Sequence, residues 1–439
     1  MSPVPSRSAH LDTKTGILVF LAFAAAYFCS ALVRAITATL SPVLTQDFAL
    51  QARDLGLLAG GYFLGFAATQ LPLGTWLDRY GPKRVILCFL SLAVLGCIAF
   101  SMATSFAGLL GARVLVGAGV SACLMAPLTG YRRWFDASTL LRANSWMLMT
   151  GSLGMLSSTL PVQWLMPLLG WRALFWVLAA LILLSMVAIA WLVPKWDIAP
   201  TLVASRTALP PEGANFPRGG PSENCLEPNQ NENGGYREIW RNPYFRRMSP
   251  LAFFNYGGMV AVQTLWAAPW MVKVAGYTAL EAATGLFFIN ATMLVTFWCW
   301  GMLNPRLAGL GWSTERLLTW GVPVSLVVLA VNIAAGASTG WLGWALFCVG
   351  SSVMGLAQPA VGMAFRQTLA GRALSGYNLV IFSGVFVVQW GIGLLIDVFL
   401  AAGFSQVGSF QSAMGVFLCC CIASYIYFVS TARVKVDNL

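Results

Sequence analysis

Apolar runs of about 20 residues recur along the chain, and short polar breaks separate them. As a helix, each run is long enough to cross about 30 Å of hydrocarbon. The pattern predicts twelve membrane-spanning helices in two groups of six, with a long polar segment between the groups. The predicted spans are residues 17–41, 54–77, 85–104, 106–129, 145–168, 173–193, 249–274, 281–303, 317–336, 341–364, 379–402 and 408–430.

Composition supports a membrane protein over a soluble one. The chain is 58% hydrophobic and 9% charged, with a mean hydropathy of +0.74. Soluble domains carry about 25% charged residues. A soluble protein this apolar could not cover its surface with polar groups. The alternating segments of about ten residues that build membrane β-barrels are absent from the sequence.

The positions of Lys and Arg predict the orientation. If the N-terminus is cytoplasmic, only Arg53, Arg172 and Lys273 fall in outside loops, and Arg34 and Arg113 fall within spans. The other 21 of the 26 Lys and Arg are then inside, as the positive-inside rule requires. We therefore expect cytoplasmic termini and an inner or plasma membrane. The net charge of +11 reflects this topology, so no nucleic-acid partner is expected.

The same pattern divides the chain into five segments. The middle segment is rich in Pro, Gly, Asn and Glu, which predicts a largely disordered linker. Its end, "YREIWRNPYFRRMSP", suits either a short helix at the inner membrane surface or a basic flank before the next span. The segments are a cytoplasmic tail (1–16), a six-helix bundle (17–193), the linker (194–248), a second six-helix bundle (249–430) and a second tail (431–439).

A charged break follows the second predicted span, in "GTWLDRYGPKRV". It resembles the signature between helices two and three of the major facilitator superfamily, and "RVLVGAG" around Arg113 resembles the helix-four signature of that family. The resemblance implies an all-α membrane fold, with twelve helices in two pseudo-symmetric six-helix bundles around a central cavity. The residues that fill the first signature are Gly74, Asp78, Arg79, Gly81, Lys83 and Arg84.

Asp78 is expected at the cytoplasmic C-terminus of a helix, where a carboxylate costs a few tenths to about 1 kcal/mol. A partner should offset this cost. The resemblance implies that the partner is the N-terminus of helix eleven, near Leu374 to Asn378, so that the motif latches the two bundles. The alternative is a cytoplasmic loop with a solvated Asp78. In the second half, Pro305 stands where Asp78 would lie.

Polar residues inside the spans are the candidates for a solute site. A charge at mid-depth costs at least about 2.5 kcal/mol and normally faces a cavity or a partner. Arg34 belongs to a helical stripe with Tyr27, Ser30, Thr37 and Ser41. Each candidate could instead bond helices together. The candidates for substrate binding are Tyr27, Arg34, Arg113, Asn255, Gln263, Trp266, Gln358 and Gln389.

Two cations without a carboxylate at mid-depth predict an anionic solute. Asp397 is the one acid inside a span and a candidate for proton coupling, with Asp47, Asp54 or titration of the solute as alternatives. The alternative is a facilitator or anion exchanger without proton coupling. No metal-like Cys and His spacing or nucleotide-binding loop occurs in the sequence, so neither metal nor cofactor is expected.

The sequence therefore predicts a secondary transporter for a small organic anion, not an enzyme. We expect it to work as a monomer in the lipid bilayer. The alternative from another class is a membrane receptor that keeps the fold without transporting.

Overall fold

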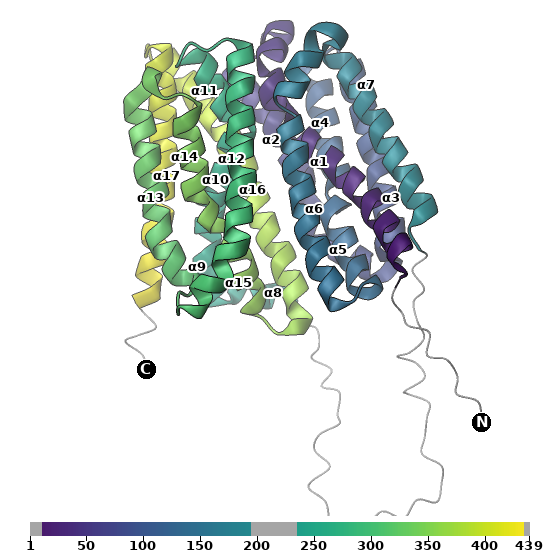
Figure 1. Cartoon of the computed structure of the whole chain (residues 1–439). Helices are drawn as coiled ribbons and strands as arrows, with labels where there is room; N and C mark the ends of the chain where they lie inside the picture. Colours follow the sequence, from purple (N-terminus) through teal and green to yellow (C-terminus); the bar gives the residue numbers. More distant parts are fainter. Residues whose placement is uncertain (1–10, 195–234, 434–439) are drawn as a thin grey trace, which may run out of the picture.

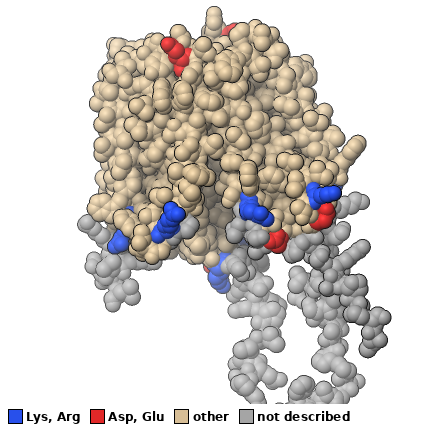
Figure 2. Space-filling model, in the orientation of Figure 1, with Lys and Arg blue, Asp and Glu red and all other residues tan. Residues whose placement is uncertain are grey.

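The computed structural model describes residues 11–194 and 235–433, and the regular structure within these ranges is helical (Figure 1). The all-α class is therefore confirmed. The helices stand in two groups side by side, which we call the first half (11–194) and the second half (235–433). The first and last described residues lie at the same end of the molecule, where Figure 2 shows Lys and Arg gathered. We call this the basic end.

Two sharp bends organise the first half. Gly81 and Gly170 have φ of 76° and 71° within otherwise continuous helices. Glycine adopts this conformation without the steric penalty of a Cβ. The predicted polar break between spans two and three is thus a bend at Gly81. The helices are α1 (Thr13–Phe48), α2 (Ala52–Ala68), α3 (Gln70–Met102), α4 (Phe106–Val120), α5 (Ala122–Trp134), α6 (Ala137–Ser157) and α7 (Leu160–Leu192).

The second half begins with a short helix and a long helix that contains two π-helical turns, η3 and η4. A π turn bonds i to i+5 and holds more residues per turn than an α-helix. The elements are α8 (Tyr236–Arg241), α9 (Pro243–Leu251), η3 (Ala252–Tyr256), α10 (Gly257–Ala261), η4 (Val262–Trp266), α11 (Ala267–Lys273), α12 (Ala279–Gly309), α13 (Thr314–Ala335), η5 (Gly336–Ser338), α14 (Trp341–Ser351), η6 (Ser352–Leu356), α15 (Ala357–Met363), α16 (Gln367–Ala401) and α17 (Gln406–Arg433).

Nine helices of the described ranges are long and apolar enough to cross a membrane. The predicted spans 54–77, 145–168 and 249–274 lie on helices that are divided, the first at Thr69 and the second at Ser158 and Thr159. The third is divided by its π turns. The count of twelve spans stays a prediction at these three places.

Most of the predicted linker and the outer parts of both predicted tails (195–234, 1–10 and 434–439) lie outside the described residues. The end of the predicted linker is helical, because α8 occupies 236–241 and α9 starts at Pro243. Ile239 of α8 is fully buried in a cluster with Phe245 and Tyr377 of the second half. Tyr236 donates a hydrogen bond across to the Leu71 carbonyl of α3, at 3.0 Å.

The two halves meet mainly where α2 lies along α16. Close approach depends on glycines, because a Cβ at Gly56 would lie 2.4 Å from the Gln389 carbonyl oxygen. A Cβ at Gly393 would lie 2.4 Å from the Ala52 carbonyl oxygen. Within the first half, Gly117 of α4 packs against the backbone of α2 in the same way. Small residues commonly permit such backbone contact between membrane helices.

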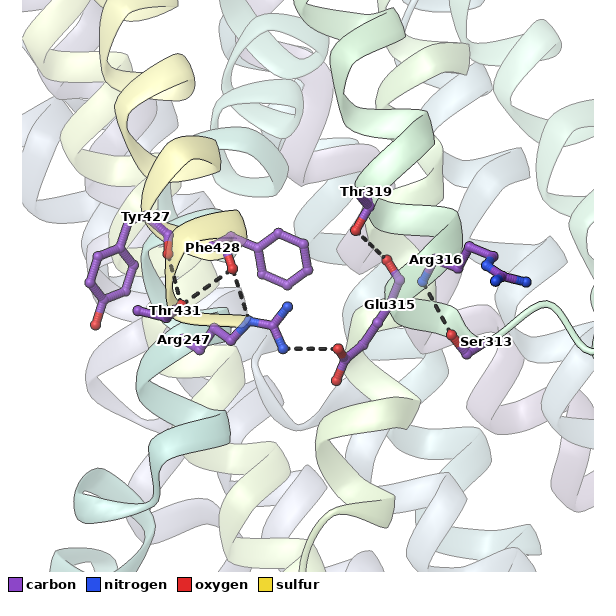
Figure 3. Close-up of polar contacts among 8 residues, drawn as sticks. All are labelled: Arg247, Ser313, Glu315, Arg316, Thr319, Tyr427, Phe428 and Thr431. Carbon is purple, nitrogen blue, oxygen red and sulfur yellow. Dashed lines mark hydrogen bonds and ion pairs between the residues drawn. The ribbon is translucent and has the colours of Figure 1, made fainter. Parts of the chain in front are cut away.

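At the basic end, Arg247 ties three helices of the second half together (Figure 3). Its Nε donates to the Phe428 carbonyl of α17 at 2.9 Å, and its Nη1 lies 2.9 Å from a Glu315 carboxylate oxygen of α13. The guanidinium also lies over the Phe428 ring, 4.2 Å from its centre. This network joins α9, α13 and α17 at the basic end of the second half.

Candidate functional site

The polar stripe of α1 lies inside the protein. Tyr27, Ser30 and Thr37 are buried, whereas Arg34 is partly accessible. A helix in a membrane keeps such a stripe away from lipid because unpaired polar groups are costly there. The stripe therefore presents Arg34 toward the boundary between the two halves.

Arg34 lies among hydroxyl groups and aromatic rings. Its guanidinium is 5.8 Å from the centre of the Phe66 ring of α2. Electrostatic interactions link it to Tyr62 of α2, to Tyr27 of α1 and to Tyr256 of η3 in the second half. The Nε atom of Arg34 is buried and has no hydrogen-bond partner among the described residues. The guanidinium thus offers a free donor at Nε, at a position that both halves reach.

Aromatic rings continue the site from Phe66 into the second half. Phe382 of α16 lies 4.4 Å from Phe66 and 6.1 Å from Phe63, measured between ring centres. Arg34 therefore stands beside an aromatic wall to which both halves contribute. We call Tyr27, Arg34, Tyr62, Phe66, Tyr256 and Phe382 the Arg34 site.

Arg113 lies behind this site, fully buried between α1, α2 and α4. Its Nη1 donates to the Val33 carbonyl at 3.0 Å, and its guanidinium is 5.3 Å from the centre of the Tyr62 ring. The Nε and Nη2 atoms have no hydrogen-bond partner within the described ranges. The visible role of Arg113 is to bond α4 to α1 next to Arg34.

The polar candidates of the second half bond helices to one another. Each makes a short contact with a neighbouring element and is mostly or wholly withdrawn from solvent. No described hydrogen bond joins any of them to Arg34, and their contact with a solute stays a prediction. The bonds are Asn255 to Ser424 (2.8 Å), Gln263 to Asn290 (3.0 Å), Trp266 to the Gln389 carbonyl (3.0 Å), Gln358 to Asn378 (2.8 Å) and Gln389 to Thr264 (3.0 Å).

The charged motif lies at the bend of α3. Lys83 donates to the Val193 carbonyl at the end of α7, at 2.6 Å, and Arg79 lies over the Tyr80 ring. Arg84 is exposed, and Gly74 packs near Ser375 of α16. The side chain of Asp78 lies outside the described part of the chain.

The expected start of helix eleven near Leu374 to Asn378 is wrong. α16 starts at Gln367, so residues 374–378 are already within the helix. Their N–H groups belong to the helix interior, because only the first four N–H groups of a helix lack an intrahelical partner. The free N–H groups of this helix, which could pair with Asp78, therefore lie near Gln367.

Asp397 lies at the end opposite the basic end, and both its oxygens are engaged. Oδ1 accepts from the Ala52 N–H at 3.2 Å, and Oδ2 accepts from the Arg53 N–H at 2.9 Å. These are the first N–H groups of α2, which attract anions. Of the alternative acids, Asp47 accepts from Trp171 Nε1 and Asp54 accepts from the Gln51 N–H.

Four members of the Arg34 site were not among the sequence candidates for substrate binding: Tyr62, Phe66, Tyr256 and Phe382. Each belongs to an apolar run, and no spacing marks it as facing Arg34. The available signal was the hydroxyl group of Tyr62 and of Tyr256 within a predicted span. Within the described ranges, no group of three or more His, Cys, Asp and Glu is placed to hold a metal ion.

Comparison with known proteins gives a family and a set of distant relatives. The family model of the Major Facilitator Superfamily matches residues 23–389. The chain is 27% identical to the hexuronate transporter of Escherichia coli K12 over 162 residues, which is 37% of each chain. It is 26% identical to the gallate transporter of Pseudomonas putida over 291 residues, covering 62% of this chain and 63% of the relative.

A 4-hydroxybenzoate transporter of Pseudomonas aeruginosa is 28% identical over 135 residues, covering 31% of this chain and 30% of the relative. Among solved structures, a bacterial homologue of the lysosomal transporter Spinster aligns with a TM-score of 0.74 at 16% identity, covering 98% of this chain and 99% of that one. A D-xylose–proton symporter aligns with a TM-score of 0.72 at 12% identity, covering 94% and 97%. At identities this low, the structural similarity shows that the fold is shared and nothing more specific.

Proposed function

Because this chain belongs to the Major Facilitator Superfamily, whose matched relatives are transporters and not enzymes, we propose that it carries a small organic carboxylate bound at Arg34. We propose further that it works as a monomer in the inner or plasma membrane, with the basic end in the cytoplasm. The two halves would expose the Arg34 site to the two sides of the membrane in turn.

The observation that carries the proposal is a guanidinium with an unpaired Nε and, among the described residues, no acidic partner. The described ion pairs involve Arg53, Arg247 and Arg366, and none of them involves Arg34. A charge held inside a membrane protein without a counter-ion is costly, so an anion that neutralises it binds favourably. The planar fork of Arg matches the two oxygens of a carboxylate.

The aromatic wall narrows the solute class. Phe66 and Phe382 present ring surface next to Arg34, and Tyr27, Tyr62 and Tyr256 add hydroxyl groups. A flat aromatic acid would pack its ring against the wall while its carboxylate meets the guanidinium. The names of two relatives, transporters of gallate and of 4-hydroxybenzoate, agree with this class. A hexuronate is the second candidate, because the third relative carries that name.

The membrane potential bears on energy coupling. Moving one negative charge inward against a potential of 100 mV costs about 2.3 kcal/mol. Accumulation of an organic anion therefore needs a co-transported cation or an exchanged anion. We favour co-transport with a proton, and the facilitator and the exchanger are the outcomes to be distinguished.

Flux into proteoliposomes tests the proposal. Labelled 4-hydroxybenzoate, gallate and glucuronate would be presented with and without an inward proton gradient. We expect saturable uptake of at least one aromatic acid, a higher rate with the gradient and loss of uptake in Arg34→Ala. Uptake that is independent of the gradient would indicate a facilitator. Binding without flux would indicate a receptor, and neither binding nor flux of any of the three acids would contradict the proposal.

A further inference from the structure

The end of the molecule opposite the basic end holds a direct hydrogen-bonded connection between the two halves. The Asp397 carboxylate of α16 accepts from the Ala52 and Arg53 N–H groups of α2, as described above. We call this connection the outer clasp. It joins positions 344 and 345 residues apart in the sequence, so it exists only while the two halves are together.

We propose that the outer clasp holds the outer gate closed, so that breaking it shifts the protein toward its outward-open state. This inference rests on the alternating exposure proposed above. A contact shifts the balance between two states only if it is present in one and absent from the other. Outward opening must draw the start of α2 away from the end of α16, which removes both hydrogen bonds.

The backbone packing around the clasp supports this role. Gly393 lies one turn before Asp397, and a Cβ there would lie 2.4 Å from the Ala52 carbonyl oxygen. The two helices therefore touch by their backbones next to the two hydrogen bonds. Both N–H groups would find water in an open vestibule, because they have no intrahelical partner. In the closed state the Asp397 carboxylate and the two N–H groups thus form charge-assisted hydrogen bonds with each other, and in the open state the same groups bind water.

A cavity of about 590 Å³ lies beside the clasp, between the two halves. Its lining includes Arg53, Leu55, Trp266, Lys273 and Asp397. Leu55 is only 6% exposed, although it lines this cavity. Outward opening would enlarge the cavity into an entrance and expose Leu55, which makes this position a reporter of the gate.

The clasp is tested by the labelling rate of a Leu55→Cys reporter in intact cells, with a membrane-impermeant maleimide added outside. Asp397→Asn keeps one acceptor but turns an amide N–H₂ toward the second N–H donor. We expect labelling about tenfold faster than in the reporter alone. Gly393→Ala, which separates the same two helices without altering a charge, should also raise the rate. The protein with native Leu55 gives the background from its own cysteines.

Asp54→Asn is the matched control. Asp54 lies in the first turn of the same helix and accepts the Gln51 N–H, but it makes no described hydrogen bond to α16. Its variant should label like the reporter alone. Unchanged labelling in Asp397→Asn and Gly393→Ala, or an equal rise in Asp54→Asn, would overturn the clasp. The labelling experiment needs no solute. If Asp397→Asn raises the labelling rate but the protein shows no carboxylate flux, the clasp is supported and only the proposed function is contradicted.

Discussion

Replacing Arg34 tests the solute site most directly. In Arg34→Ala the carboxylate loses a charge-assisted pair of hydrogen bonds, each worth about 1.5–3 kcal/mol. Part of that energy offsets desolvation of the carboxylate, so we expect a net loss of about 3 kcal/mol, or on the order of 100-fold in Kd. Arg34→Lys keeps a point charge but loses the fork, so a loss of about tenfold is expected.

The assay is titration of purified protein with two matched ligands, 4-hydroxybenzoate and its uncharged amide. The wild type should prefer the acid, and Arg34→Ala should lose that preference, because only the acid uses the guanidinium. The unfolding temperature should change little, since Arg34 belongs to none of the described ion pairs and its polar neighbours are the hydroxyl groups of Tyr27 and Tyr62. Equal weakening of acid and amide, or an unchanged preference for the acid, would refute the assignment.

Three further changes test other parts of the structure. Gly117→Ala should destabilise the protein by about 2 kcal/mol or more in a thermal melt, because its Cβ would lie 1.9 Å from the Tyr62 carbonyl oxygen. Arg247→Ala should lower the melting temperature more than Glu315→Gln, because it also removes the bond to the α17 carbonyl; equal effects would contradict this. Asp78→Asn should slow uptake while leaving the amount of protein in the membrane unchanged; uptake at the wild-type rate would remove Asp78 from the gate.

Sequence patterns locate the helices well because apolar length is a local property. The α1 stripe also identified Arg34 and Tyr27, since spacing along one helix defines a face. The opposite wall could not be found in this way. Tyr256 reaches Arg34 only through the docking of the second half on the first, and no local pattern records which helix faces which.

Asp397 is a second residue whose partners could not be predicted from the sequence. Its rarity as an acid inside a span made it stand out in the sequence, whereas its partners are backbone N–H groups more than 300 residues away. Backbone donors have no sequence signature beyond the start of a helix. The second-half amides are similar, because a Gln that lines a cavity and a Gln that bonds two helices look identical in the sequence.

The two π turns of the 243–273 helix mark the places where this helix can change its length by one residue. A π turn holds an extra residue within one turn, so the helix before it and the helix after it keep the same relative orientation. Deleting one residue within η3 should let that turn return to α geometry without rotating the rest of the helix. The same deletion in a regular α-helix would rotate every residue beyond it by about 100°. A relative without the π turn should therefore align with this helix across a one-residue gap.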